Sequence, residues 1–147
     1  MLSRGAVLAV LLAGCGAPDE PLPVACRADT DAYATALQAA PDAVQLDGTT
    51  LAECVRRSTS DAELVSIGAT LTSLGEQLEL RAVGGDRTAA RPRGYPGGAA
   101  ARAARDTEGI HAELAYRLER SGAALTDRPN GVEDELRRGI RAGSASG

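Results

Sequence analysis

Apolar side chains recur every three or four residues along most of the chain, which is the spacing of one face of an α-helix. The clearest segment begins at Ser60-Asp61-Ala62-Glu63, a capping box in which the serine and glutamate side chains each bind a backbone amide of the first turn. The apolar positions that follow, three and four residues apart, are Leu64, Ile67, Leu71, Leu74 and Leu78. Gly84-Gly85 ends the pattern, so we predict a helix over about 60–83.

Two shorter helices are expected before this segment. Thr30 can cap the first and Pro41 stops it, and its inward side chains are Tyr33, Leu37 and Ala40. The second starts at Asp47, Thr49 or Thr50 and places Leu51, Cys54 and Val55 on one side. No stretch alternates between apolar and polar residues over enough positions to predict a strand.

Residues 84–98, with the sequence GGDRTAARPRGYPGG, contain so many glycines and prolines that they predict a loop. A fourth helix is expected over 99–125. Its inward positions are Ala103, Thr107, Ile110, Leu114, Leu118, Ser121 and Leu125. On its outer face, Glu113 and Arg117 are four residues apart in the order that favours an ion pair.

The last 22 residues, 126–147, predict a short helix and a tail. Pro129 interrupts the preceding helix, and Asn130 can cap a new one. The apolar positions of this last helix are Val132, Leu136 and Ile140. The final residues, GSASG, are expected to be frayed.

The first residues of the chain have a different pattern. Arg4 precedes an apolar block, Gly5 to Ala13, that is too short to cross a bilayer, because a membrane-spanning helix needs about 20 apolar residues. A basic start, a short apolar middle and small residues at the end are typical of a cleaved secretory signal. The stretch Leu12-Ala13-Gly14-Cys15 resembles the lipobox of bacterial lipoproteins, in which leucine and two small residues precede a cysteine.

The resemblance implies that residues 1–14 are a signal peptide and that the Cys15 thiol carries a diacylglyceryl group. Two or three acyl chains would hold the protein on a membrane, because each buried methylene contributes about 0.8 kcal/mol. The expected location is therefore the cell membrane or the outer membrane, on the extracytoplasmic side. The alternatives are an ordinary secretory signal with a chance cysteine, and a buried apolar N-terminal helix.

A proline-rich segment follows the cysteine. Pro18, Pro21 and Pro23 favour extended polyproline geometry. At about 3.1 Å per residue, the ten residues 16–25 could hold a domain about 30 Å from the lipid surface. We therefore predict that residues 15–28 form a lipidated cysteine and a stalk.

Once Cys15 is lipidated, Cys26 and Cys54 remain as one possible pair, in a compartment that permits disulfides. If the two short helices form an antiparallel hairpin, these cysteines become neighbours. On the loop-entropy model, closing the 28-residue separation contributes about 3.5 kcal/mol. A redox or nucleophilic cysteine is the alternative, but neither a C-x-x-C motif nor a neighbouring histidine supports it.

These patterns predict an all-α protein. The two long helices would pack antiparallel, with the disulfide-stapled helical hairpin laid across them, as a small helical bundle over residues 29–125. The core must be built from Leu, Val, Ile and Ala, because the chain has no Phe or Trp and only three Tyr. A covalent staple suits a domain with such a small aromatic content.

The charge balance argues against a nucleic-acid partner. The chain has 16 basic residues, all of them arginine, and 20 acidic residues, for a formal net charge of −4. A nucleic-acid binder needs a basic footprint instead. With its many alanines, the body resembles small Ala/Arg-rich lipoproteins of high-GC bacteria, a likeness of composition that assigns no residue a role.

Few residues suggest catalysis. His111 is the only histidine, and no G-x-S-x-G motif accompanies it. Glu108 and His111 have the Glu-x-x-His spacing of di-iron bundles, but such a site needs a second copy of the motif. We therefore expect His111 on a solvated helical face, and we expect no catalytic residue, no cofactor and no metal.

Arginines gather on both sides of the predicted 84–98 loop. They are Arg81, Arg87, Arg91, Arg93, Arg102 and Arg105. One hypothesis is an anion-binding site formed by Arg81, Arg91, Arg93, Arg102 and Tyr95, which would meet anionic lipid headgroups or a phosphate-bearing cell-wall polymer through bidentate arginine contacts. The alternative is that a coding bias fills a solvated loop with arginine and glycine. Tyr95 could anchor a ligand or fold down onto the core.

Two functions fit these features best, and an enzyme of unrecognised type is the third alternative. The first is a non-enzymatic, membrane-anchored envelope lipoprotein that presents a helical interaction module to a protein or polymer of the envelope. The second is a small-molecule or anionic-ligand binding or sensor subunit that uses the arginine-rich segment and a groove between helices. For the second we expect a pocket lined by Arg81, Arg102 and Tyr95.

Overall fold

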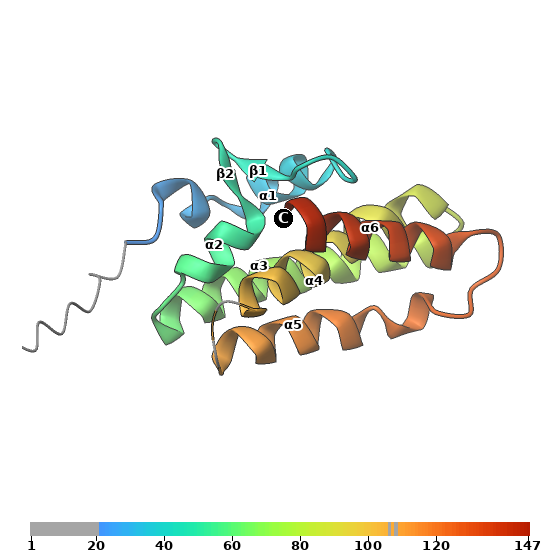
Figure 1. Cartoon of the computed structure of the whole chain (residues 1–147). Coiled ribbons are helices and arrows are strands. Elements are labelled where there is room, and N and C mark those ends of the chain that lie inside the picture. Colours follow the sequence, from blue (N-terminus) through green and yellow to red (C-terminus); the bar gives the residue numbers. More distant parts are fainter. Residues whose placement is uncertain (1–20, 106, 108) are drawn as a thin grey trace, which may run out of the picture.

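The protein is an all-α bundle, as predicted, in a computed structural model that describes residues 21–105, 107 and 109–147 (Figure 1). The α-helices are α1 (Thr30–Leu37), α2 (Leu51–Arg57), α3 (Asp61–Val83), α4 (Ala90–Arg105), α5 (Ile110–Ser121) and α6 (Val132–Ser146). Three short 3-10 helices accompany them: η1 (Val24–Arg27), η2 (Arg87–Ala89) and η3 (Ala123–Leu125). A two-stranded antiparallel ribbon, β1 (Gln45–Leu46) and β2 (Thr49–Thr50), joins α1 to α2.

Helix α3 confirms the strongest sequence prediction. The Ser60 side chain accepts from the Glu63 amide, and the Glu63 carboxylate accepts from the Ser60 amide, which completes the capping box. The predicted leucine and isoleucine positions face the core, and only Leu78 among them is partly exposed. Gly84 is the C-cap residue of α3, as predicted.

The α1–α2 region matches the prediction in outline. Asp29, and not Thr30, caps α1 by accepting from the Ala32 amide, whereas Thr50 caps α2 as one of the expected alternatives. The ribbon between them was not predicted, because strands of two residues are too short to show alternation. Asp47 and Gly48, both at positive φ, form its turn.

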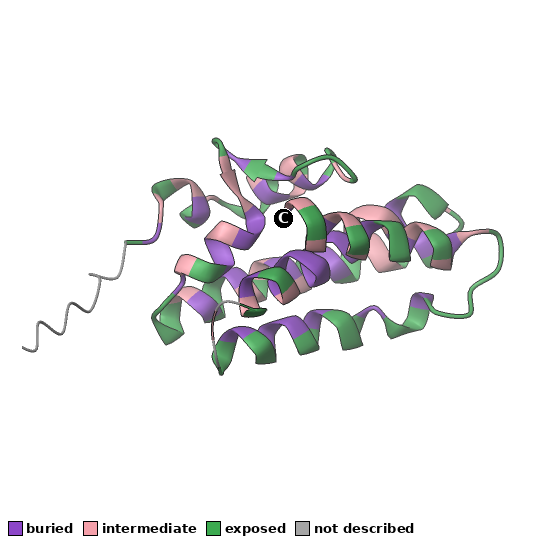
Figure 2. Ribbon diagram, viewed as in Figure 1, coloured by how far each residue is buried: buried purple, intermediate pink, exposed green. Residues whose placement is uncertain are grey.

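The predicted loop over 84–98 is wrong: a helix begins at Ala90 and includes Pro96. This helix, α4, is the most buried element (Figure 2). Its glycines permit backbone contact with α6, since a Cβ on Gly98 would lie 2.0 Å from the Ile140 carbonyl oxygen. A Cβ on Gly139 would likewise lie 2.0 Å from the Arg91 carbonyl oxygen. The contact between α4 and α6 therefore requires glycine at these positions, although glycine lowers the stability of an isolated helix.

Helices α4 and α6 run parallel to each other. Gly139 meets Arg91, Gly143 meets Tyr95 and Gly147 meets Ala99, so the contact positions rise together along both helices. The tail over 143–147, which we expected to be frayed, therefore belongs to the bundle, and Gly143 is buried. The prediction of a bundle that ends at residue 125 omitted this helix.

The predicted single helix over 99–125 is two helices. Helix α4 ends at Arg105 and α5 begins at Ile110, after Gly109 at a φ of +79°. The direction of the chain reverses there, so that Gly97 in α4 lies beside Glu119 in α5. The sequence does not break its apolar stripe at this point, which is why the reversal was not predicted.

Part of the segment that we predicted to be a stalk, residues 15–28, belongs to the folded domain. Leu22 is 6% exposed and joins the core, and Cys26 in η1 is buried as well. Residues 22–28 are therefore packed on the domain and cannot act as an extended spacer. Residues 1–20, which hold the predicted signal peptide, the lipobox and Pro18, lie outside the described residues.

Candidate functional site

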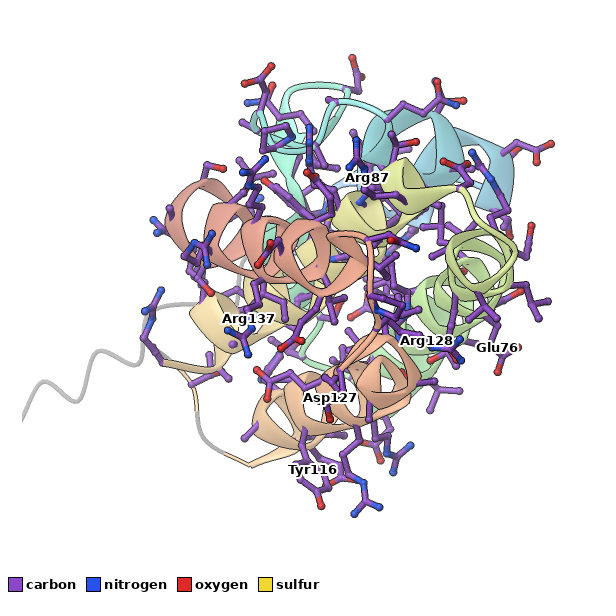
Figure 3. The ribbon with its side chains drawn as sticks, turned by 90° about the vertical axis from the view of Figure 1, so that its right-hand side faces the viewer. Glu76, Arg87, Tyr116, Asp127, Arg128 and Arg137 are labelled. Atoms are coloured by element: carbon purple, nitrogen blue, oxygen red, sulfur yellow. A yellow bond between two sulfur atoms is a disulfide. The ribbon has the colours of Figure 1, made fainter. Side chains whose placement is uncertain are left out.

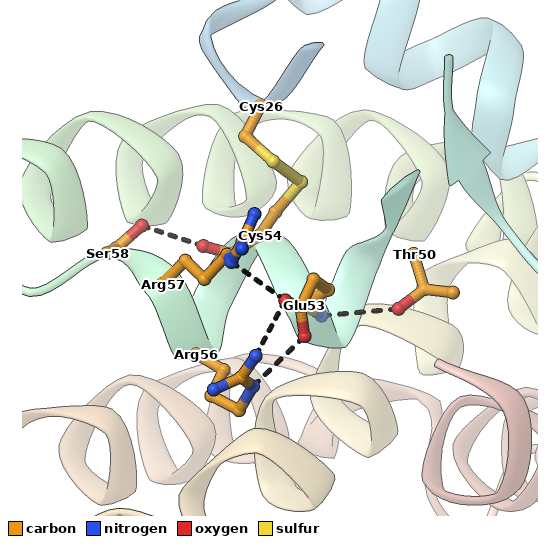
Figure 4. Close-up of polar contacts among 7 residues, drawn as sticks. All are labelled: Cys26, Thr50, Glu53, Cys54, Arg56, Arg57 and Ser58. Atoms are coloured by element: carbon orange, nitrogen blue, oxygen red, sulfur yellow. Dashed lines mark hydrogen bonds and ion pairs between the residues drawn. A yellow bond between two sulfur atoms is a disulfide. The ribbon is translucent and has the colours of Figure 1, made fainter. Parts of the chain in front are cut away.

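Cys26 and Cys54 form the predicted disulfide, with their Cα atoms 5.3 Å apart (Figure 4). Cys26 lies in η1 and Cys54 in α2, and both are buried. The Tyr33 hydroxyl donates to the Cys26 carbonyl oxygen at 2.8 Å, and burial raises the pKa of this phenol to about 12. The Ser58 hydroxyl donates to the Cys54 carbonyl oxygen at 2.8 Å. The bridge is a structural element inside the core.

His111 is buried, which corrects the prediction of a solvated position. It is 6% exposed, and its Nε2 lies 3.0 Å from the carbonyl oxygen of Ser58, itself fully buried at the end of α2. The second ring nitrogen, Nδ1, has no hydrogen-bond partner among the described residues. Glu108, the other half of the Glu-x-x-His spacing, lies outside them. The imidazole thus connects the start of α5 to the turn between α2 and α3.

Arg93 is a buried arginine that links three helices. From α4, its Nη2 donates to Ser121 Oγ at 2.9 Å, and its Nε lies 3.7 Å from Glu79 Oε2 of α3. Glycines on both sides make room for the guanidinium, because a Cβ on Gly75 or Gly122 would lie 3.3 Å from it. Burial lowers the pKa of Arg93, and Glu79 opposes that shift. The side chain is 3% exposed, and these contacts join α4 to α3 and α5.

Arg102 and Tyr95 both form hydrogen bonds with residues of α6. Arg102 Nη1 donates to the Ala145 carbonyl oxygen at 2.9 Å, at the end of α6 where carbonyl groups lack helical partners. The Tyr95 hydroxyl accepts from the Val44 amide at 3.0 Å and lies 3.2 Å from Ser146 Oγ. Tyr95 is fully buried. The expected pocket lined by Arg81, Arg102 and Tyr95 therefore does not form.

Two of the predicted anion-binding residues do meet in one cavity. Arg81 of α3 and Arg91 of α4 both line a space of about 600 Å³ between α1, α3 and the η2–α4 segment. Its apolar part includes Leu37, Leu74 and Leu78. Its polar part, besides the two arginines, comprises Gln38, Gln77 and Thr88. We call this space the α1–α3–α4 cavity; its volume is in the range of small-molecule sites.

Both cavity arginines have carboxylate partners outside the lining. Arg81 Nη2 lies 2.6 Å from Asp86 Oδ2, and Arg91 donates from Nε at 2.6 Å to Glu135 Oε2 of α6. The hydrogen bond from the Thr88 hydroxyl and the contact with Arg81 lower the pKa of Asp86. These contacts orient the guanidinium groups, while the lining itself contains no acidic residue.

A second, more open groove of about 500 Å³ lies between α3 and α5. Val65 and Ile110, which line it, are 69% and 43% exposed. Glu113 and Arg117 at its edge form the predicted i,i+4 ion pair, with Arg117 Nε 2.8 Å from Glu113 Oε1. Further along α5, Tyr116 points away from the bundle (Figure 3).

Two features were missed from the sequence. The contribution of α1 to the cavity depends on how α1 packs against α3, which local patterns do not specify. The α4–α6 contact had a signal, because Gly94 and Gly98 in one helix, and Gly139 and Gly143 in the other, are four residues apart. Such small-xxx-small spacing lets two helix backbones approach closely.

Comparisons with known proteins gave no match to a protein-family model, to a curated protein or to a solved structure. Within the described ranges, none of the helices has the length and hydropathy needed to span a membrane. In the same ranges, no three His, Cys, Asp or Glu side chains gather into a group that could hold a metal ion.

Proposed function

We propose that the protein is a non-enzymatic envelope lipoprotein, anchored by a lipidated Cys15 to the cell membrane or outer membrane, with its helical domain on the extracytoplasmic side. The lipobox Leu12-Ala13-Gly14-Cys15 is the basis of the anchor. The domain acts as an interaction module for a protein or polymer of the envelope.

The observation that carries this proposal is the buried Cys26–Cys54 disulfide. Disulfides persist in oxidising compartments such as the periplasm or the cell surface and are rare in the cytosol. The bridge thus supports export, independently of the lipobox. It also leaves Cys15 as the one cysteine of the chain outside the pair.

A binding role without catalysis is supported by how the polar side chains are used. His111 and Arg93 are both buried, and each completes a contact between helices. The described surface offers a cavity and a groove instead, each large enough for a ligand or a peptide side chain.

Metabolic labelling with palmitate in a bacterial host tests the anchor. The wild-type chain should incorporate label and fractionate with membranes, and Cys15→Ser should do neither. The matched control is the double variant Cys26→Ser/Cys54→Ser, which removes the other cysteines and should still be labelled. Equal membrane association of wild type and Cys15→Ser, with no label in either, would contradict the proposal.

A second function is favoured by one specific observation, that Arg81 and Arg91 line the same cavity. On this hypothesis the domain is a small-molecule or anionic-ligand binding or sensor subunit. Thermal unfolding in the presence of small organic and inorganic anions tests it. A ligand of the folded state raises the midpoint in a concentration-dependent way, and no shift with any anion at millimolar concentration would contradict the hypothesis.

A further inference from the structure

We infer that the α1–α3–α4 cavity binds a small amphipathic monocarboxylate, with its carboxylate at Arg81 and Arg91 and its apolar body against the leucines. This inference rests on the second proposed function and names the class of ligand. Three observations support it: the volume of the cavity, the residues that line it, and the hydrogen-bond donors that the two arginines leave unused.

The volume and the apolar lining of the cavity indicate that its ligand has an apolar body. The space is about 600 Å³, and Leu37 and Leu74, which are 2% and 5% exposed, form part of its wall. Leu78, also in the lining, is only partly covered by the protein. Because Leu37 and Leu74 are already buried, a short alkyl chain or a ring would mainly cover Leu78 and the partly exposed Ala34, Ala40 and Pro92 of the lining. Covering them removes apolar area from water at about 25 cal/mol per Å².

The polar part of the lining selects a negatively charged head. Arg81 and Arg91 belong to the lining, whereas Asp86 and Glu135, their carboxylate partners, do not. Arg81 uses Nη2 for Asp86, so its Nε and Nη1 have no partner among the described residues. Nη1 of Arg91 likewise has no partner among the described residues. A guanidinium with unused donors matches the planar geometry of a carboxylate.

The same ion pairs limit the charge of the ligand. Each arginine already faces one carboxylate, and Glu135 is shared with Arg138, so the three arginines and two carboxylates together carry about one net positive charge. A polyphosphate would bring more negative charge than the site can balance, whereas one carboxylate needs only the remaining donors. Gln38, Gln77 and Thr88 add neutral hydrogen-bonding groups to the lining.

Decanoate, below its micellar concentration, is a suitable probe, and the full chain carrying Cys15→Ser is the protein, since it needs no detergent. Calorimetric titration should give one saturable site. Butyrate, which lacks the apolar body, and decanol, which lacks the charge, should each bind at least about tenfold more weakly, since each loses one of the two contributions. Decanoate should also move the side-chain Nε–Hε resonances of Arg81 and Arg91 in NMR spectra.

Two pairs of variants locate the site. Arg81→Gln should weaken decanoate binding about tenfold, whereas Arg117→Gln, which removes an equally exposed and ion-paired arginine on α5, should leave it unchanged. Ala34→Leu, which fills the cavity, should abolish binding, and Ala112→Leu on the exposed face of α5 should not.

The outcomes separate the inference from the function it rests on. Inorganic phosphate binding as tightly as decanoate, with loss in Arg81→Gln, would overturn the carboxylate class and keep an anion site. Decanoate binding that is equal in Arg81→Gln and Arg117→Gln would overturn the placement of the head. No binding of decanoate, butyrate or phosphate would overturn both the inference and the second proposed function.

Discussion

Gly98 of α4 lies against the backbone of Ile140 of α6, so closely that a Cβ at position 98 would be 2.0 Å from the Ile140 carbonyl oxygen. The neighbouring Gly97 faces the other way, and its Cβ would first meet Glu119 Cγ at 3.6 Å, an ordinary contact. One glycine is thus required by packing and the other is not.

We therefore expect opposite effects from two adjacent substitutions. Gly98→Ala should lower the free energy of unfolding by about 3 kcal/mol or more, because a backbone atom must move to relieve the clash. Gly97→Ala should be neutral or stabilising by up to about 1 kcal/mol, because alanine is the better helix former. Urea unfolding measures both. Equal effects of the two would show that α4 and α6 are not in backbone contact.

The Tyr95 hydroxyl gives a second prediction. It accepts from the buried Val44 amide, so Tyr95→Phe leaves that donor without a partner and should cost about 1–3 kcal/mol of unfolding free energy. Tyr116→Phe is the control, because among the described residues the Tyr116 hydroxyl accepts only from Arg120 Nη1, on an exposed surface. This substitution should change stability by less than about 0.5 kcal/mol. A Tyr95→Phe protein as stable as the wild type would contradict the hydrogen bond between Tyr95 and the Val44 amide.

The disulfide should contribute a large part of the stability. Replacing both Cys26 and Cys54 by alanine should lower the free energy of unfolding by about 3.5 kcal/mol, because the unfolded chain loses the constraint on a 28-residue loop. The measurement is chemical unfolding of the variant beside the oxidised and reduced wild type. If reduction leaves the unfolding midpoint where it was, the bridge has no stabilising role.

The Tyr33 phenol should lose its proton at a higher pH than an exposed tyrosine does. Burial raises its pKa from 10.0 to about 12 in the folded protein. A raised pKa contributes stability that is fully present below the unfolded value and is lost as the pH rises through the folded value, so this contribution should decline between about pH 10 and 12. Ultraviolet titration of phenolate checks this, since Tyr33→Phe should remove a component with a midpoint near 12. A wild-type titration without that component would contradict the burial of Tyr33.

How far the sequence predicts this fold depends on how local each signal is. Helix α3 carries its own cap and its own apolar stripe, so its boundaries could be predicted from neighbouring residues alone. The 84–98 segment could not, because its glycines and prolines disfavour a helix in isolation. Helix α6 supplies the contact that makes Gly94 and Gly98 suitable there.

The candidate site shows the same limit. Arg81 and Arg91 were predicted as anion ligands and share a cavity, whereas Arg93 and Tyr95, two and four residues after Arg91, are turned inward. Residue type suggested one arginine cluster. The helical geometry of α4 distributes its members between the cavity and the core, and a loop prediction could not foresee that division.

The central claim is that Cys15 is the lipidated first residue of the mature protein, and mass spectrometry of protein extracted from bacterial membranes tests it most directly. We predict an N-terminal peptide that starts at Cys15 and carries the mass of a diacylglyceryl group. A membrane-extracted chain that retains residues 1–14, or one whose Cys15 carries no acyl mass, would contradict the claim.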